Sequence, residues 1–274
     1  MIGDLFRNAI LRRALVEAIL VGSIGGAVGV HVVLRRLPFF TMAVGHGTFP
    51  GVVVASLAGT SLLLGGWAFA LVIVLATAAL GSIGRLDDNS AVGVILAGSF
   101  ALGTLLISTQ PGFTKNLSAF LVGSILTVQS GDLVATAVVG SVVIAVLAGL
   151  HKEFVLVAFD RTAAGALGYA TAALDLALLL CVAATVVTIV PAVGVVLSVA
   201  LLVTPAATAR LWSDHLVPTM VLAGAIGAAA GFLGLLVSTE WNVAAGGSIV
   251  LVATAAFAVS VLIAPRGVVF GRGR

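Results

Sequence analysis

Uncharged apolar segments of about 20 residues recur along the whole chain, and they limit its fold more than any other feature. A helix of roughly 20 residues crosses the hydrocarbon core of a bilayer, which is about 30 Å thick. Only 8% of the 274 residues are charged, whereas soluble domains carry about a quarter. The sequence therefore predicts an all-α polytopic membrane protein, a bundle of about eight to ten transmembrane helices.

Short charged or turn-forming stretches divide the apolar sequence into nine candidate spans. Their ranges are 14–34, 43–64, 66–84, 90–108, 132–150, 171–190, 193–211, 217–238 and 244–264. A shorter apolar piece, 116–130, is predicted to be a short or re-entrant segment that returns to the side from which it entered. Residues 1–13 form an amphipathic, arginine-bearing stretch without a signal cleavage site, so we expect an interfacial helix there.

Lysine and arginine between the spans predict the orientation, because cytoplasmic loops are enriched in both residues. If the nine candidate spans each cross the membrane once, these basic residues all lie in the cytoplasm: Arg35, Arg36, Arg85, Lys152, Arg161, Arg210 and the three arginines of a cytoplasmic tail at 266–274. Arg7, Arg12 and Arg13 then lie outside and fit the rule badly. Because the loops explain the net charge of +3, no nucleic-acid partner is expected.

Glycine and proline are placed where they affect helix packing. Gly22 and Gly26 in the first span, and Gly227 and Gly231 in the eighth, repeat at i, i+4 and predict close helix packing, with a dimer seam as the alternative. Four prolines lie within or at the ends of apolar runs and predict discontinuous helices: Pro50, Pro191, Pro205 and Pro218.

Several catalytic sequence motifs are absent from the chain. It contains no G-x-x-x-x-G-K-[ST] phosphate loop, no H-E-x-x-H, no paired cysteines and no G-x-S-x-G. If ATP drives this protein, another chain must bind the nucleotide. We therefore predict a conduit across the membrane rather than an enzyme.

Ionisable side chains near membrane depth are few, and each is costly in lipid. Glu17 and Asp175 lie in the first turns of their predicted spans, where an acid suits a helix N-terminus and can reach the headgroups. Asp132 follows Gly131 and is predicted to be an N-cap. His46 has no such position, and the residues alone leave two interpretations, a packed structural histidine or a ligand.

Five segments, in order along the chain, are similar to one family. The run VVLRRLPFFTMAVGHGTFPGV at 32–52 resembles the pattern V-V-L-R-R-x-x-x-x-G-D-A-x-S-H-A-x-L-P-G. The others are an acidic loop with its following span at 85–108, LSAFLVGSIL at 117–126, FDRTAAGALG at 159–168 and VGVVLSVALLVTPAATARL at 193–211. From about residue 10 to residue 265, the chain resembles the permease subunits of bacterial zinc/manganese/iron ABC importers.

The resemblance implies a permease domain at 14–265 in the bacterial inner membrane, with a cytoplasmic coupling segment at 152–170. It also implies three protein partners: a cytoplasmic ABC ATPase dimer, an extracytoplasmic metal-binding protein, and a second permease subunit in a homodimer or heterodimer. No permanently bound cofactor is implied, because zinc or manganese is the cargo. The residues expected to meet the ATPase are Asp160, Ala163, Ala164 and Gly168; otherwise this segment is an ordinary amphipathic loop helix.

One departure from the family pattern affects the expected metal pathway. The family places aspartate and histidine at i, i+4, so that both side chains can reach one ion. Here the histidine is His46, but Met42 stands at the aspartate position. Carboxylates suit harder ions such as manganese, whereas methionine is a soft, weak donor.

Three interpretations of Met42 remain open. His46, with Met42 or alone, carries a softer ion such as zinc; a second, different permease supplies the carboxylate; or the substrate is not a bare metal ion. An ATP-independent, ion-coupled secondary transporter is the main alternative function, although we find no internal inverted repeat. A structural or signalling membrane subunit is a further alternative.

Overall fold

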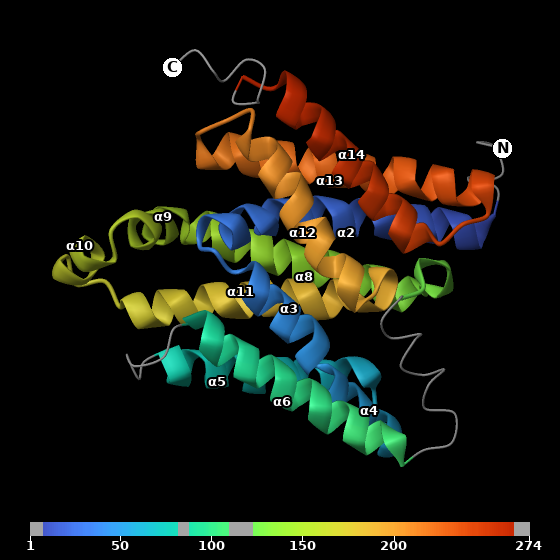
Figure 1. Ribbon diagram of the computed structural model, residues 1–274, viewed down its shortest axis with the longest axis horizontal. Helices are drawn as coiled ribbons and strands as arrows, with labels where there is room; N and C mark the ends of the chain where they lie inside the picture. Colours follow the sequence, from blue (N-terminus) through green and yellow to red (C-terminus); the bar gives the residue numbers. More distant parts are fainter. Residues whose placement is uncertain (1–7, 82–87, 110–122, 266–274) are drawn as a thin grey trace. The chain divides into compact units, whose positions relative to one another are not determined.

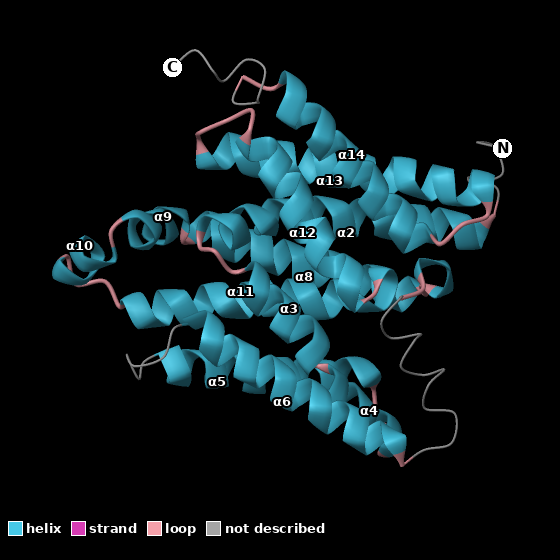
Figure 2. Ribbon diagram, in the orientation of Figure 1, coloured by secondary structure: helices cyan, strands magenta, loops and turns pink. Residues whose placement is uncertain are grey.

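The computed structural model describes residues 8–81, 88–109 and 123–265, and all regular structure in these ranges is helical (Figures 1 and 2). The helices are α2 (Ala9–Leu34), α3 (Pro38–Gly47), α4 (Phe49–Leu57), α5 (Leu62–Gly81), α6 (Asp88–Ser108), α8 (Ser130–Gly149), α9 (His151–Phe159), α10 (Arg161–Ala166), α11 (Thr171–Val193), α12 (Val195–Arg210), α13 (Leu216–Trp241) and α14 (Ala245–Ile263), with a 3₁₀ turn, η1, at Ile125–Thr127. The predicted all-α class is confirmed.

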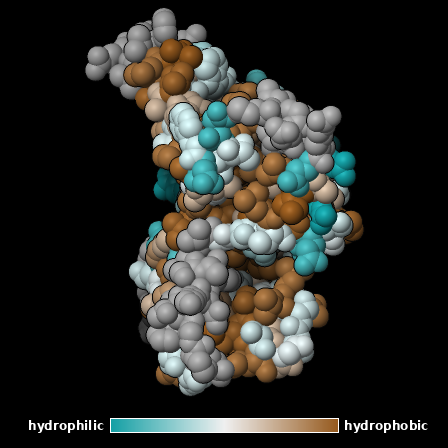
Figure 3. Space-filling model, turned by 90° about the vertical axis from the view of Figure 1, so that its right-hand side faces the viewer, coloured by the Kyte–Doolittle hydropathy of each residue, from teal (hydrophilic) through white to brown (hydrophobic). Residues whose placement is uncertain are grey.

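Eight helical segments of the described residues are long and apolar enough to cross a membrane. Seven are single helices, and the other, Pro38–Leu57, combines α3 and α4. The remaining predicted span, 193–211, corresponds to α12, whose 16 residues cover only about 24 Å, less than a hydrocarbon core. Large apolar side chains are exposed along the spans, such as Val134, Val138 and Val142 on one face of α8. Figure 3 views the molecule from the right-hand side of Figure 1 and shows apolar residues in brown among hydrophilic residues in teal on that face.

The described residues cover only part of the segments predicted at the N-terminus, in the loops and at the tail. Because α2 begins at Ala9, residues 9–13 continue the first span as one helix. Four parts of the predictions lie outside the described residues: residues 1–7 of the predicted interfacial segment, Arg85, most of the predicted re-entrant piece and the arginines of the tail. The described end of the re-entrant piece contains the single turn η1, which precedes α8.

The described residues form two compact units. The first comprises the described parts of 1–33, 119–140 and 189–274, and the second those of 34–118 and 141–188. In the first unit α12, α13 and α14 pack against one another, and α2 lies against α13. In the second unit α3 and α4 pack against α5 and α6.

Glycine permits the contact between α2 and α13 inside the first unit. A Cβ atom on Gly22 would overlap the carbonyl oxygen of Gly227, and one on Gly227 would overlap that of Gly22. One turn further along α2, a Cβ atom on Gly26 would likewise overlap the carbonyl oxygen of Ala223. The predicted close packing at small residues is confirmed, and it joins helices of one chain.

Replacing Gly22 with alanine is expected to force α2 and α13 apart. Overpacking of this kind costs about 1–3 kcal/mol, so the thermal midpoint of the detergent-purified protein should fall by roughly 3–10 °C. Gly98→Ala is the matched control, because Gly98 is also helical and a Cβ there meets no heavy atom within 4 Å. A thermal unfolding scan measures both variants, and equal midpoints would contradict this account of the contact.

Proline interrupts a span at one of the four predicted positions. Pro50 has no N–H to donate to the carbonyl of His46, four residues earlier, and the second span divides between them at Thr48. Pro191 and Pro205 lie inside continuous helices, α11 and α12, and Pro218 lies in the first turn of α13. The prediction of discontinuous helices therefore holds at Pro50 and is wrong at the other three.

Candidate functional site

The short helix α3 carries both residues of the predicted metal pathway. Met42 and His46 lie one turn apart and are half-buried, as is Phe39 one turn before Met42. The spacing i, i+3, i+7 places these three side chains on one face of α3. The neighbours Ala43, Val44, Gly45 and Gly47 are buried, so this face is the more accessible stripe of the helix.

The ring of His46 is held by a backbone carbonyl and an aromatic side chain. Its Nδ1 atom lies 3.1 Å from the carbonyl oxygen of Met42. The ring of Phe100, on α6, meets it edge to face with centroids 5.7 Å apart. Because a carbonyl oxygen only accepts hydrogen bonds, this contact is a hydrogen bond in the tautomer with the hydrogen on Nδ1, which leaves the lone pair on Nε2. Metal-binding histidines commonly use this arrangement, in which the second ring N–H donates to an oxygen.

No complete metal centre accompanies His46 in the described part of the chain. Within these ranges, no three side chains among His, Cys, Asp and Glu lie close enough to hold one ion. The α3 face offers one imidazole nitrogen and one thioether sulfur from its own sequence.

The acidic side chains near membrane depth differ from expectation. Glu17 is not in a first turn that reaches the headgroups; it lies well inside α2, is buried, and its Oε1 accepts a hydrogen bond of 2.8 Å from Thr136. That prediction was wrong because α2 begins earlier than the apolar run indicates. Asp132 does act at a helix start, but as the third residue of α8, where its Oδ2 accepts from the backbone N–H of Gln129 at 2.8 Å.

The predicted coupling segment forms a helical hairpin of α9 and α10 outside the spans (Figure 1). Asp160 is the N-cap of α10, and its Oδ1 accepts the N–H of Ala163 at 2.8 Å. Ala164 is fully buried, and Ala163 is half-buried. Gly168 has a φ of +87° just after α10, and hydrogen bonds from Gly168 and Tyr169 close the end of the helix. These four residues therefore build the hairpin, each through a local contact or conformation.

The exposed apolar side chains of the hairpin were not predicted as site residues. Phe159 is 77% exposed, Leu167 is 69% exposed and Tyr169 is 42% exposed. They lie outside the eight candidate membrane spans of the described residues. The signal in the sequence was three large apolar residues within a segment bounded by charged residues.

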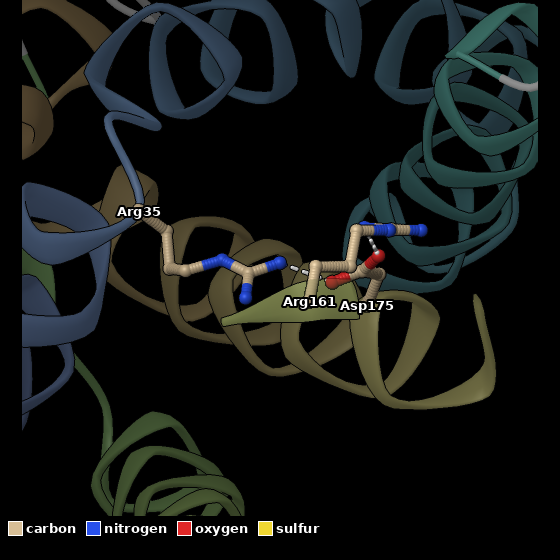
Figure 4. A network of polar contacts seen from close by, with 3 residues as sticks. All are labelled: Arg35, Arg161 and Asp175. Carbon is tan, nitrogen blue, oxygen red and sulfur yellow. Dashed lines mark hydrogen bonds and ion pairs between the residues drawn. The ribbon is translucent and has the colours of Figure 1, made fainter. Parts of the chain in front are cut away.

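Asp175 joins two segments that are far apart in the sequence (Figure 4). Its Oδ1 accepts from Nη2 of Arg35, in the connection between α2 and α3, and its Oδ2 accepts from Nη1 of Arg161, in α10. The sequence predicted only an acid at a helix start. Since both arginines meet one carboxylate, their two connections lie on the same side of the membrane, as the charge pattern predicts.

Three comparisons relate the chain to known proteins. Residues 7–264 match the family model described as the ABC 3 transport family. The chain is 33% identical over 271 residues to the manganese transport system membrane protein MntC of Listeria monocytogenes, which covers 98% of this chain and 96% of that protein. It is 35% identical over 256 residues to the manganese import system permease protein ScaB of Streptococcus gordonii, and the match covers 93% of this chain and 92% of that protein. The solved structure of PsaBC from Streptococcus pneumoniae in complex with Fab matches with a TM-score of 0.89 and 32% identity, over 100% of this chain and 98% of that one.

Proposed function

The chain belongs to the ABC 3 transport family, and we propose that it is the permease subunit of an importer for a divalent transition metal ion, with manganese as the first candidate. It is a multi-pass protein of the bacterial cell membrane. The observation that carries the proposal is similarity over nearly the whole chain to two proteins named for manganese transport. Bacterial cells that lack this chain should hold less manganese under metal limitation, and an unchanged metal content by elemental analysis would contradict the proposal.

In this proposal ATP is hydrolysed by a separate cytoplasmic ABC ATPase dimer. The sequence supports a separate chain, because it lacks the G-x-x-x-x-G-K-[ST] phosphate loop. The other proposed partners are an extracytoplasmic metal-binding protein and a second permease subunit, which is either identical to this chain or different from it.

The α9–α10 hairpin is the proposed docking element for the ATPase. Phe159, Leu167 and Tyr169 supply large, exposed apolar groups, the kind of side chain that anchors protein interfaces. Asp160, Ala163, Ala164 and Gly168 give the hairpin its shape, through the N-cap, the helix packing and the helix end described above. The docking surface is thus formed by the large side chains, and the four predicted residues position it.

The α3 face supports zinc as a second candidate cargo. Imidazole binds zinc, manganese and related ions, but the thioether of Met42 is a soft donor and poorly suited to manganese. His46 is the proposed binding residue of the pathway, and Met42 the residue that sets preference among ions. No cofactor is required, because the metal is the substrate.

Replacing Met42 with aspartate tests the role of this position. A carboxylate one turn before His46 can share an ion with its Nε2, and oxygen ligands favour manganese. We expect the ratio of manganese to zinc uptake to rise by about tenfold, within the 10–100-fold range typical of changes near a metal. Met220→Asp, which places the same charge at a half-buried methionine of α13, should leave the ratio unchanged. A ratio unaltered by Met42→Asp at matched expression would show that this face does not select the ion.

A further inference from the structure

Three segments of the second unit converge on the carboxylate of Asp175. Arg35 comes from the three-residue connection between α2 and α3, Arg161 from the first residue of α10, and Asp175 from the second turn of α11. Figure 4 shows the carboxylate between the two arginine side chains. Each carboxylate oxygen receives one guanidinium, so neither arginine can move far without changing the balance of charge on Asp175.

The two ion pairs differ in their surroundings. The side chains of Arg35 and Asp175 are 18% and 22% exposed, whereas that of Arg161 is 58% exposed. An exposed pair contributes little to stability, but removing one partner of a largely buried pair leaves an uncompensated charge. The Arg35–Asp175 pair is therefore the firm attachment, and the Arg161–Asp175 pair can break and re-form more readily.

Arg35 is connected to the metal pathway by a short length of chain. Only Arg36 and Leu37 separate it from α3, and Thr41 fixes the start of that helix through two hydrogen bonds to the carbonyl of Leu37, from its N–H and its hydroxyl, each 3.0 Å. From Pro38 to His46 the helix axis advances about 12 Å. A displacement of Arg35 therefore moves the beginning of the helix that carries His46.

Arg161 is connected to the docking hairpin just as directly. It is the first residue of α10 and follows the N-cap Asp160, whose side chain bonds to the backbone of that helix. A movement of α10 must therefore move the backbone of Arg161. Asp175 thus stands between the element proposed to meet the ATPase and the element proposed to bind the ion.

We propose that Asp175 is a positioning residue that transmits movement of the α9–α10 hairpin to α3, so that ATP hydrolysis on the partner chain changes the position of His46. The proposal rests on the transport function proposed above. Asp175 does not touch the ion; it acts through Arg35 and Arg161.

The test uses the complete transporter, reconstituted with its ATPase and binding protein, and measures metal ions moved per ATP hydrolysed. Asp175→Asn and Arg35→Gln should lower this ratio by about tenfold while ATP hydrolysis continues, and Asp175→Glu should restore part of it.

The double variant Asp175→Asn with Arg35→Gln should be no worse than either single variant, because both remove the same connection. Asp132→Asn, which alters an acid that caps α8, is the control and should keep the wild-type ratio. Arg161→Gln removes an exposed side chain, so it should fold normally and also lower the ratio.

A second readout does not depend on which substrate is moved. Hydrogen–deuterium exchange of the α3 backbone should change when ATP is added to the wild-type complex, and this change should be lost in Asp175→Asn and Arg161→Gln. If the wild type moves no metal but shows this difference, the cargo is wrong and the inference stands. Two results would overturn the inference. One is an ATP-dependent change in α3 exchange that is equal in the wild type and in the assembled variants. The other is a ratio of ions moved per ATP that the variants leave unchanged.

Discussion

Replacing His46 with alanine is expected to reduce metal uptake by about tenfold or more at matched expression, within the 10–100-fold range typical of changes at a metal site. The physical reason is the loss of Nε2, the nitrogen left with a lone pair once Nδ1 donates to the carbonyl of Met42. The described residues contain no cluster of three His, Cys, Asp or Glu side chains that could hold an ion in its place. Uptake of radioactive manganese and zinc in whole cells measures the effect.

The control for this experiment is His215→Ala. His215 is an exposed histidine that precedes α13, and the variant removes an imidazole without altering the α3 face. It should keep wild-type uptake of both ions. If His46→Ala and His215→Ala transport both ions equally well, His46 is a packed structural histidine and the proposed pathway is wrong.

Replacing Leu167 with aspartate is expected to weaken binding of the ATPase by about tenfold or more, and ATP-dependent uptake should fall with it. Leu167 is 69% exposed at the end of α10, outside the candidate membrane spans. A charge there would have to be desolvated in an apolar interface, and this cost opposes docking. Recovery of the ATPase with the affinity-purified permease is the measurement.

Thr162→Asp separates a lost contact from a general effect of charge. Thr162 is exposed near the beginning of the same helix, where a negative charge is favourable because of the helix dipole. This variant should recover the ATPase as the wild type does. Full recovery with Leu167→Asp would show that the docking surface lies elsewhere, and similar losses in both variants would show only that the hairpin rejects charge.

Apolar run length predicted most of the fold, because a span must be long and uncharged to lie in lipid. It did not predict where α2 begins, since a helix that lies in the interface and one that enters the membrane share the same local pattern near Arg12 and Arg13. The i, i+4 spacing placed Met42 and His46 on one helix face, and the spacing of glycines predicted the α2–α13 contact. Both are local properties of a helix, which the order of residues determines.

The contacts between distant segments could not be predicted in this way. Arg35 and Asp175 are 140 residues apart, and Glu17 and Thr136 are 119 residues apart, so no local periodicity connects them. The burial of Ala164 depends on the direction in which α10 turns against α9, which six residues of helix do not specify. Pro191 and Pro205 lie within continuous helices, where their surroundings determine whether a proline interrupts the chain.

The central claim is that this chain conducts a divalent transition metal ion when a partner hydrolyses ATP. The most direct measurement is uptake of radioactive manganese, with zinc in parallel, into liposomes that contain the purified chain, its ATPase and its binding protein. Uptake should require ATP and should be abolished when the ATPase is omitted. Uptake that persists without the ATPase and follows an ion gradient, or no uptake of either metal by an ATP-hydrolysing complex, would contradict it.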